Sequence, residues 1–153
     1  MGKSLAVEVL AVLKRIEAKP GVAEQLSTAS KTLTVEHRWD REKSMRVSTT
    51  TLLLNSDIGI ITMPGEPFHQ FQVDWRRKAG LPHAFFFGYC SSAEDGWSGY
   101  IPDIESAARG GYGASDSTRV AVGTGERLLN EGLVQLYTLQ GRLKTAPQRH
   151  LNQ

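Results

Sequence analysis

The sequence predicts an α/β protein in which helices pack on a mixed sheet and a long loop rich in glycine and aromatic residues follows the central strand. Three observations predict this class: helical patterns alternate with β-rich runs, several strands precede the middle helix, and another apolar strand follows it. The 153 residues, 40% of them hydrophobic, suffice for one globular domain with one core. We expect this domain over residues 1–144 and a flexible tail over 145–153.

The first element is predicted to be an amphipathic helix over residues 3–18. Apolar residues recur at helical spacing from Leu5 to Ile16, and charged residues fill the other positions. The segment Lys19-Pro20-Gly21 ends the pattern, because proline and glycine do not continue a helix.

Three strands are predicted next. Residues 32–39 alternate between apolar and polar, as in a half-buried strand, and the charged residues 40–43 are predicted as a turn. Two further β-rich runs, 45–54 and 58–63, are separated by Asn55-Ser56-Asp57, a cluster suited to a tight turn. We expect these two runs to pair antiparallel.

A helix over residues 67–79 and a buried strand over 83–89 are predicted to follow. Pro67 suits the first position of a helix, where the missing N–H would have no partner, and Gly80 suits its end. The continuously apolar run 83–89 is typical of a central strand that is buried on both faces of a sheet.

The remaining segment is predicted to be a shaped loop followed by a helix. Residues 90–116 combine glycines with aromatic side chains, and long loops in compact domains often carry function. The last helix is predicted over 124–139, with Thr124 as its N-cap and Gly141 just past its end.

Composition excludes some classes of function. The net charge of +2 gives no support for nucleic-acid binding, and no apolar run is long enough for a transmembrane segment. No export signal is visible, because charged residues interrupt the first apolar segment and no cleavage site follows it. Cys90 is the single cysteine, so neither an internal disulfide nor a cysteine-based zinc site can form.

Glu66 is the first candidate for chemistry, because it lies between a strand end and a helix start, where α/β sheets gather ligands. The local sequence alone favours a simpler role, in which Glu66 complements the positive end of the helix dipole. His69 follows three residues later, but a single Glu-x-x-His pair is a weak metal signal and His37, His83 and His150 are scattered. No nucleophile elbow or phosphate-binding loop is present.

Four ordered motifs resemble the C-terminal portion of the catalytic domain of the neutral/alkaline non-lysosomal ceramidase family. The match covers roughly residues 52–141, although Tyr100 is followed by Ile-Pro where the family has Ile-Thr. The motifs are Met63-Pro64-Gly65-Glu66, Phe85-Phe86-Phe87-Gly88-Tyr89-Cys90, Gly99-Tyr100-Ile101-Pro102 and Gly110-Gly111-Tyr112-Gly113-Ala114-Ser115.

The resemblance implies a zinc-dependent hydrolase of lipid amides, such as N-acylsphingosine. In this family the zinc ligands include the glutamate and the tyrosine that match Glu66 and Tyr100, together with two histidines from earlier in the chain. The zinc histidines and the active-site serine are therefore expected in an N-terminal half of the domain that this chain lacks. The chain would be a partial catalytic-type domain, inactive without that half, from a parent that is often secreted or at the cell surface.

Two other readings stay open. A non-catalytic α/β binding module could have kept the scaffold and lost the metal. A self-sufficient metalloenzyme would need Glu66, His69 and a further histidine such as His83 in one place. Under the hydrolase reading, an aromatic groove would receive the acyl chain of the substrate. The residues assigned to this substrate pocket are Phe68, Tyr89, Trp97 and Tyr112.

Overall fold

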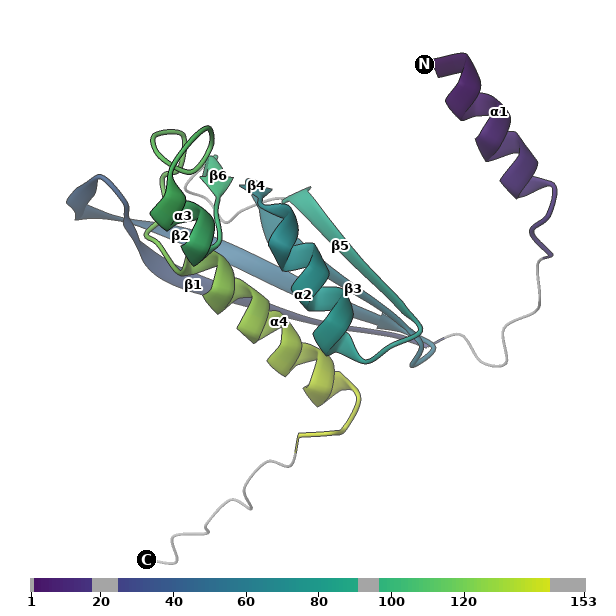
Figure 1. Cartoon of the computed structure of the whole chain (residues 1–153). Helices are drawn as coiled ribbons and strands as arrows, with labels where there is room; N and C mark the ends of the chain where they lie inside the picture. Colours follow the sequence, from purple (N-terminus) through teal and green to yellow (C-terminus); the bar gives the residue numbers. More distant parts are fainter. Residues whose placement is uncertain (1, 18–24, 91–96, 144–153) are drawn as a thin grey trace, which may run out of the picture.

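The structure, a computed structural model, describes residues 2–17, 25–90 and 97–143 (Figure 1). The helices in these ranges are α1 (Gly2–Leu13), α2 (His69–Ala79), α3 (Ile104–Arg109) and α4 (Thr124–Leu139). The strands are β1 (Leu26–His37), β2 (Asp40–Leu54), β3 (Ile58–Pro64), β4 (Glu66–Pro67), β5 (His83–Cys90) and β6 (Tyr100–Ile101). The predicted tail and residues 91–96 of the predicted loop lie outside the described residues.

The main sheet is mixed, as predicted. Its strands lie in the order β1-β2-β3-β5, with β1, β2 and β3 antiparallel and β3 and β5 parallel. Helix α2 connects the two parallel strands, as such a crossover requires. Strands β4 and β6 form a second, two-stranded parallel sheet. The predicted class, a mixed sheet with helices packed on it, is confirmed.

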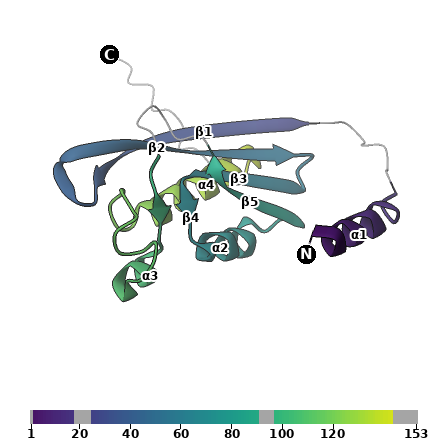
Figure 2. The same ribbon diagram turned by 90° about the horizontal axis from the view of Figure 1, so that it is seen from above.

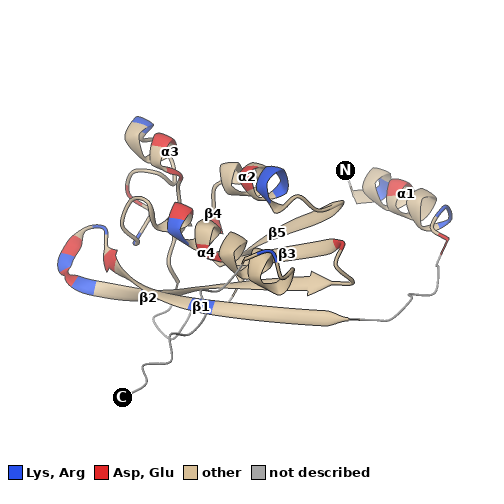
Figure 3. Ribbon diagram, turned by 90° about the horizontal axis from the view of Figure 1, so that it is seen from below, with Lys and Arg blue, Asp and Glu red and all other residues tan. Residues whose placement is uncertain are grey.

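The two hairpins differ in how well their sequences predict them. Asn55 and Ser56 take positive φ angles of 49° and 67°, so the predicted turn between β2 and β3 is correct. The predicted turn over 40–43 is wrong, because β2 already begins at Asp40 and pairs with His37. The hairpin extends beyond the helices that cover the sheet, and its end therefore has charged residues where a buried strand would have apolar ones (Figure 3).

Helix α2 begins at His69, two residues later than predicted. Pro67 lies in β4, where the N–H groups of Glu66 and Phe68 donate to the carbonyl oxygens of Gly99 and Ile101, both at 3.0 Å. In a parallel ladder only alternate residues donate to a given neighbour, so the proline between them costs no hydrogen bond. The end of the helix is as predicted: Gly80 takes φ 63°.

Helices α2 and α4 pack on one side of the main sheet, which we call the covered face (Figure 2). Strand side chains point to this face alternately, and Val47, Leu53 and Ile61 are buried beneath the helices. The close fit depends on glycines in α4: a Cβ at Gly125 would lie 2.1 Å from the ring of Phe71. Helix α4 has the predicted bounds, but its N-cap is Gly123 rather than Thr124.

The opposite side of the sheet, which we call the open face, has no described element packed on it. Strand β5 was predicted as a central strand buried on both faces, but it is the last strand of the sheet, and Phe85 and Phe87 are exposed. The open face has an apolar half and a hydroxyl half. The apolar half consists of Leu52, Leu54, Ile58, Ile60, Phe85 and Phe87, and the hydroxyl half of Ser30, Thr32, Ser48 and Thr50.

Helix α1 stands away from the sheet, and none of its residues is buried (Figure 1). It ends at Leu13, earlier than the predicted residue 18. Its apolar residues, including Leu5 and Val9, are exposed. None of the helices in the described ranges is long and apolar enough to cross a membrane.

Candidate functional site at the ends of β3 and β5

The candidate site lies at the carboxyl ends of the two parallel strands. Strand β3 leads through Gly65 into Glu66, and the chain after β5 returns to Tyr100 in β6. Glu66 and Tyr100 are register partners in the β4–β6 pair. Partners in a parallel pair lie about 4.8 Å apart and direct their side chains to the same side. The structure therefore brings together the two residues that the resemblance nominated as zinc ligands.

Two glycines with positive φ angles allow the backbones at this site to come close. Gly65 has φ 61°, and a Cβ there would lie 2.3 Å from the carbonyl oxygen of Gly99. Gly99 has φ 73°, and a Cβ there would lie 2.3 Å from the carbonyl oxygen of Ser117. A side chain at Gly65 would push β4 away from β6, and one at Gly99 would push β6 away from Ser117, so both glycines are needed for the register of Glu66 and Tyr100.

Aromatic rings surround the Tyr100 side chain. Its ring meets Phe68 edge-on with centroids 6.2 Å apart and Tyr112 with centroids 5.5 Å apart. The hydroxyl groups of Tyr100 and Tyr112 are hydrogen-bonded at 3.4 Å. Gly113 lies against the Tyr100 ring, where a Cβ would be 3.0 Å from two ring carbons. These contacts fix the ring, and so they fix the position of its hydroxyl group.

A second aromatic pair continues the site toward solvent. Tyr89 and Trp97 are stacked with their ring centroids 5.9 Å apart. Tyr89 has φ 56°, an unusual conformation for an aromatic residue, and its N–H donates to the carbonyl oxygen of Gly65 at 2.7 Å. The exposed fraction is 67% for Tyr89 and 48% for Trp97, so this pair presents an accessible aromatic surface.

The carboxyl group of Glu66 interacts with two phenols. A hydrogen bond to Glu66 raises the pKa of Tyr89, and burial and the negative charge of Glu66 add to the shift. The pKa of Tyr100 is raised well above its usual range by the hydrogen bond with Tyr112, then by burial and by a hydrogen bond to Glu66. Both phenols therefore keep their protons at neutral pH and can donate to the carboxylate.

All four residues assigned to the substrate pocket lie around this site. Phe68 and Tyr112 contact the Tyr100 ring, and Tyr89 interacts with Glu66 and carries Trp97 on its ring. The sequence offered no means of deriving these contacts, because they join a strand end, a loop and a short strand. They follow from the glycine-dependent pairing of β4 with β6.

Among the described residues, His69 and His83 do not form a metal cluster with Glu66. His83 begins β5, at the opposite end of the strand from Tyr89, and their separation of six positions corresponds to about 20 Å of extended chain. His69 is exposed in the first turn of α2. Within residues 2–17, 25–90 and 97–143 no three histidine, cysteine, aspartate or glutamate side chains are close enough to hold a metal ion. The self-sufficient metalloenzyme therefore has no geometric support.

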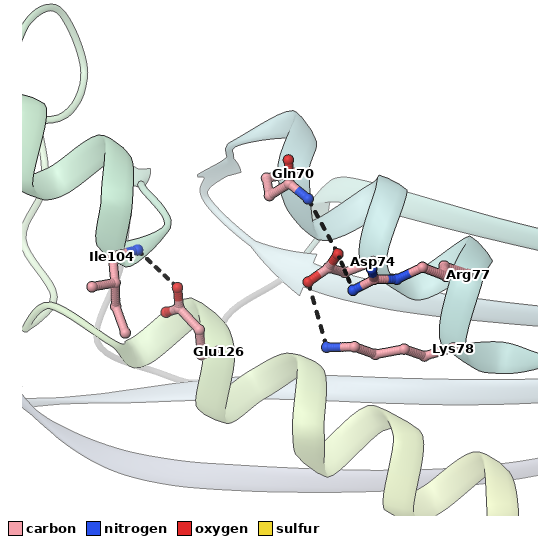
Figure 4. A network of polar contacts seen from close by, with 6 residues as sticks. All are labelled: Gln70, Asp74, Arg77, Lys78, Ile104 and Glu126. Carbon is pink, nitrogen blue, oxygen red and sulfur yellow. Dashed lines mark hydrogen bonds and ion pairs between the residues drawn. The ribbon is translucent and has the colours of Figure 1, made fainter.

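A cleft of about 640 Å³ lies elsewhere, between α2, α3 and α4. Asp74 on its wall accepts hydrogen bonds from Gln70, Arg77 and Lys78, and Glu126 accepts one from the N–H of Ile104 at 2.8 Å (Figure 4). Arg77 and Lys78 are exposed and pair with Asp74, contacts that the i, i+3 and i, i+4 spacing could have revealed.

Glu66 and Tyr100 fit a zinc ion as a partial ligand set. A carboxylate and a phenol are hard oxygen donors of the kind that zinc accepts, and register pairing presents them on one side. A structural or catalytic zinc needs at least three protein ligands, so this pair is not a complete site. Compared with known proteins, the chain matches no family model, no curated protein and no solved structure.

Proposed function

We propose that this chain is the C-terminal part of a zinc-dependent amide hydrolase similar to neutral ceramidase, with Glu66 and Tyr100 as two of the zinc ligands. The pairing of these two residues across β4 and β6 is the observation that supports the proposal most directly. The aromatic side chains around them give this edge of the sheet an apolar surface that suits the acyl chain of a lipid amide.

Zinc, when bound, supplies a Lewis acid that polarises the amide carbonyl and activates water. The residues of this chain position the ligands. Phe68 and Tyr112 hold the Tyr100 ring, and the Tyr112 hydroxyl lies next to the phenolic proton that Tyr100 must release in order to ligate the metal. The exposed Tyr89–Trp97 pair would contact the substrate. The remaining ligands and the nucleophile would come from an N-terminal half, so this chain alone is expected to be inactive.

The second candidate function is a binding module that kept the scaffold without the metal. The exposed stack of Tyr89 and Trp97 favours it, because aromatic surfaces bind apolar ligands without any catalytic group. The two functions differ in zinc binding, which only the first requires.

The test is a calorimetric titration of the purified full chain with Zn²⁺ at neutral and at mildly alkaline pH. We expect weak binding, because two oxygen ligands leave the site open. For the same reason, the purified chain should retain well below one equivalent of zinc. The affinity should rise with pH, since Tyr100 must lose a proton whose pKa is raised. Glu66→Ala and Tyr100→Phe should each weaken binding by about tenfold or more.

Two matched variants serve as controls. Glu105→Ala removes an exposed carboxylate of α3, and Tyr137→Phe removes a phenol whose hydroxyl donates to the carbonyl oxygen of Lys78. Neither should change zinc affinity. Zinc retained at one equivalent would contradict the proposal that this chain holds only part of the site. Binding that Glu66→Ala and Tyr100→Phe leave unchanged would contradict the ligand assignment. No zinc binding at all would favour the binding module.

A further inference from the structure

The sequence of β5 is typical of a strand covered on both faces, although the described elements cover only one of them. Ala84 and Phe86 pack against the core beneath the helices, while Phe85 and Phe87 on the other side are about half exposed, at 49% and 50%. A sheet with one face in water shows polar residues at alternate positions. Aromatic residues at these alternate positions of β5 indicate that this face is buried by another element or molecule.

The open face carries no charge over its central part. Its side chains on β1 from Thr28 to Thr34, on β2 from Ser48 to Leu54 and on β3 from Ile58 to Thr62 are all uncharged. The charged residues of β1 and β2 gather mainly toward the hairpin that joins the two strands (Figure 3). Lysine, glutamate and aspartate are common on solvated surfaces and are depleted at the centres of interfaces.

The hydroxyl groups of the open face form hydrogen bonds with one another and with the backbone. Ser30 and Thr50 share a hydrogen bond of 2.8 Å across the strands, and Thr32 and Ser48 share one of 2.9 Å. The Thr62 hydroxyl accepts from the backbone N–H of Thr50 at 3.1 Å. A polar group that already has a partner loses little when water is removed, so these hydroxyls impose a small desolvation penalty.

From these observations we propose that a second copy of this chain packs on the open face, with the two sheets face to face. The inference does not depend on the proposed hydrolase function, since it needs neither zinc nor substrate. A two-fold axis perpendicular to the strands lays β3 and β5 of one copy on the same strands of the other. With the axis at the level between Phe85 and Phe87, Phe85 of one copy lies near Phe87 of its partner, and the uncharged central parts of the two faces meet.

The dimensions of the face favour a second sheet over α1, the other uncovered apolar element. Four strands about 4.8 Å apart and a stretch of some six residues give a flat area of roughly 15 by 20 Å. A helix is about 10 Å wide with its side chains, so α1 would leave part of this area in water. Two such faces together give roughly 600 Å², which corresponds to a weak interface that forms at high protein concentration.

The test measures the mass of the full chain in solution by sedimentation equilibrium over a range of concentrations. We expect a dimer. Phe87→Lys places a charge in the interface and should yield a monomer, whereas Val134→Lys, which changes an equally exposed residue of α4, should leave the dimer intact. Val9→Lys on α1 should also leave it intact.

Phe87→Thr is the second interface variant, in case the lysine prevents folding, because threonine is well accepted in strands. It should raise the dissociation constant of the dimer by about tenfold or more, with an unchanged circular dichroism spectrum. A wild-type monomer at all concentrations would overturn the proposal. Loss of the dimer in Val9→Lys would overturn it as well, because it would make α1 the contact.

Discussion

The two faces of the main sheet are made by the same strands and differ in what lies on them. On the covered face, Val47 and Ile61 are completely buried under α2 and α4. On the open face, Ile60 is only half-buried and Phe85 is exposed. Yet both faces of β3 and β5 are apolar. Strands with apolar residues on both faces are normally buried on both faces. For β3 and β5, the described structure contains the elements that bury one face and none that buries the other.

The largest effect expected from this comparison is a difference between neighbouring isoleucines. Ile61→Ala removes a completely buried side chain and should lower the free energy of unfolding by about 2–5 kcal/mol. Ile60→Ala, on the open face, should lower it by only about 1 kcal/mol, because its side chain is already partly in water. Urea unfolding at low protein concentration measures both, since dilution dissociates any dimer.

If both variants lowered the free energy of unfolding equally at low protein concentration, the difference between the two faces would be contradicted. Ile60 would then be as well buried within one chain as Ile61. If the decrease in the free energy of unfolding caused by Ile60→Ala grew with protein concentration, the result would support burial of Ile60 by a second copy of the chain.

The fit of α4 on the covered face gives the next effect. Gly125→Ala places a Cβ 2.1 Å from the ring of Phe71, which is buried and has no room to move. Overpacking of this kind costs about 1–3 kcal/mol and outweighs the roughly 1 kcal/mol that alanine gains over glycine in a helix. Thermal unfolding should therefore show a lower melting temperature. The exposed change Asn130→Ala in the same helix should be neutral or slightly stabilising, and a stabilised Gly125→Ala would show that α4 is not tightly packed.

The parts of the fold that the sequence predicted well are those determined by neighbouring residues. Asn55 and Ser56 accept the positive φ angles of a tight turn, so the β2–β3 hairpin is visible in the sequence. The helical pattern predicted α4 to within one residue at its start and correctly at its end, because its apolar face and the glycines beside it are local signals. The helix between β3 and β5 is the connection that parallel strands require, but the sequence did not show that these two strands are neighbours.

The parts that the sequence could not predict depend on contacts between distant segments. Pro67 looks like the first residue of a helix, and only its pairing with Ile101 reveals a strand. The exposed side of β5 is invisible in its sequence, because the run 83–89 is apolar throughout. At the candidate site, Glu66 and Tyr100 were nominated by resemblance rather than by spacing, and their role as zinc ligands stays a prediction.

The smallest expected effect concerns the end of the open face, where Tyr89 follows Phe85 and Phe87 and meets Glu66. The hydrogen bond to Glu66 raises the pKa of Tyr89, and Glu66 contributes, after Tyr112 and burial, to the raised pKa of Tyr100. A raised pKa in the folded state means that the neutral phenols stabilise the fold below about pH 10, and that this contribution is lost as the pH rises through the folded-state values.

Glu66→Gln should therefore shift the ionisation of these tyrosines toward pH 10, as followed by the ultraviolet absorbance of tyrosinate, because the amide carries no negative charge. The matched change Glu105→Gln in α3 should leave the titration unchanged. An unchanged titration in Glu66→Gln would mean that Glu66 does not face the two phenols in solution. The same result would also weaken its assignment as a zinc ligand beside Tyr100, since both depend on one register between β4 and β6.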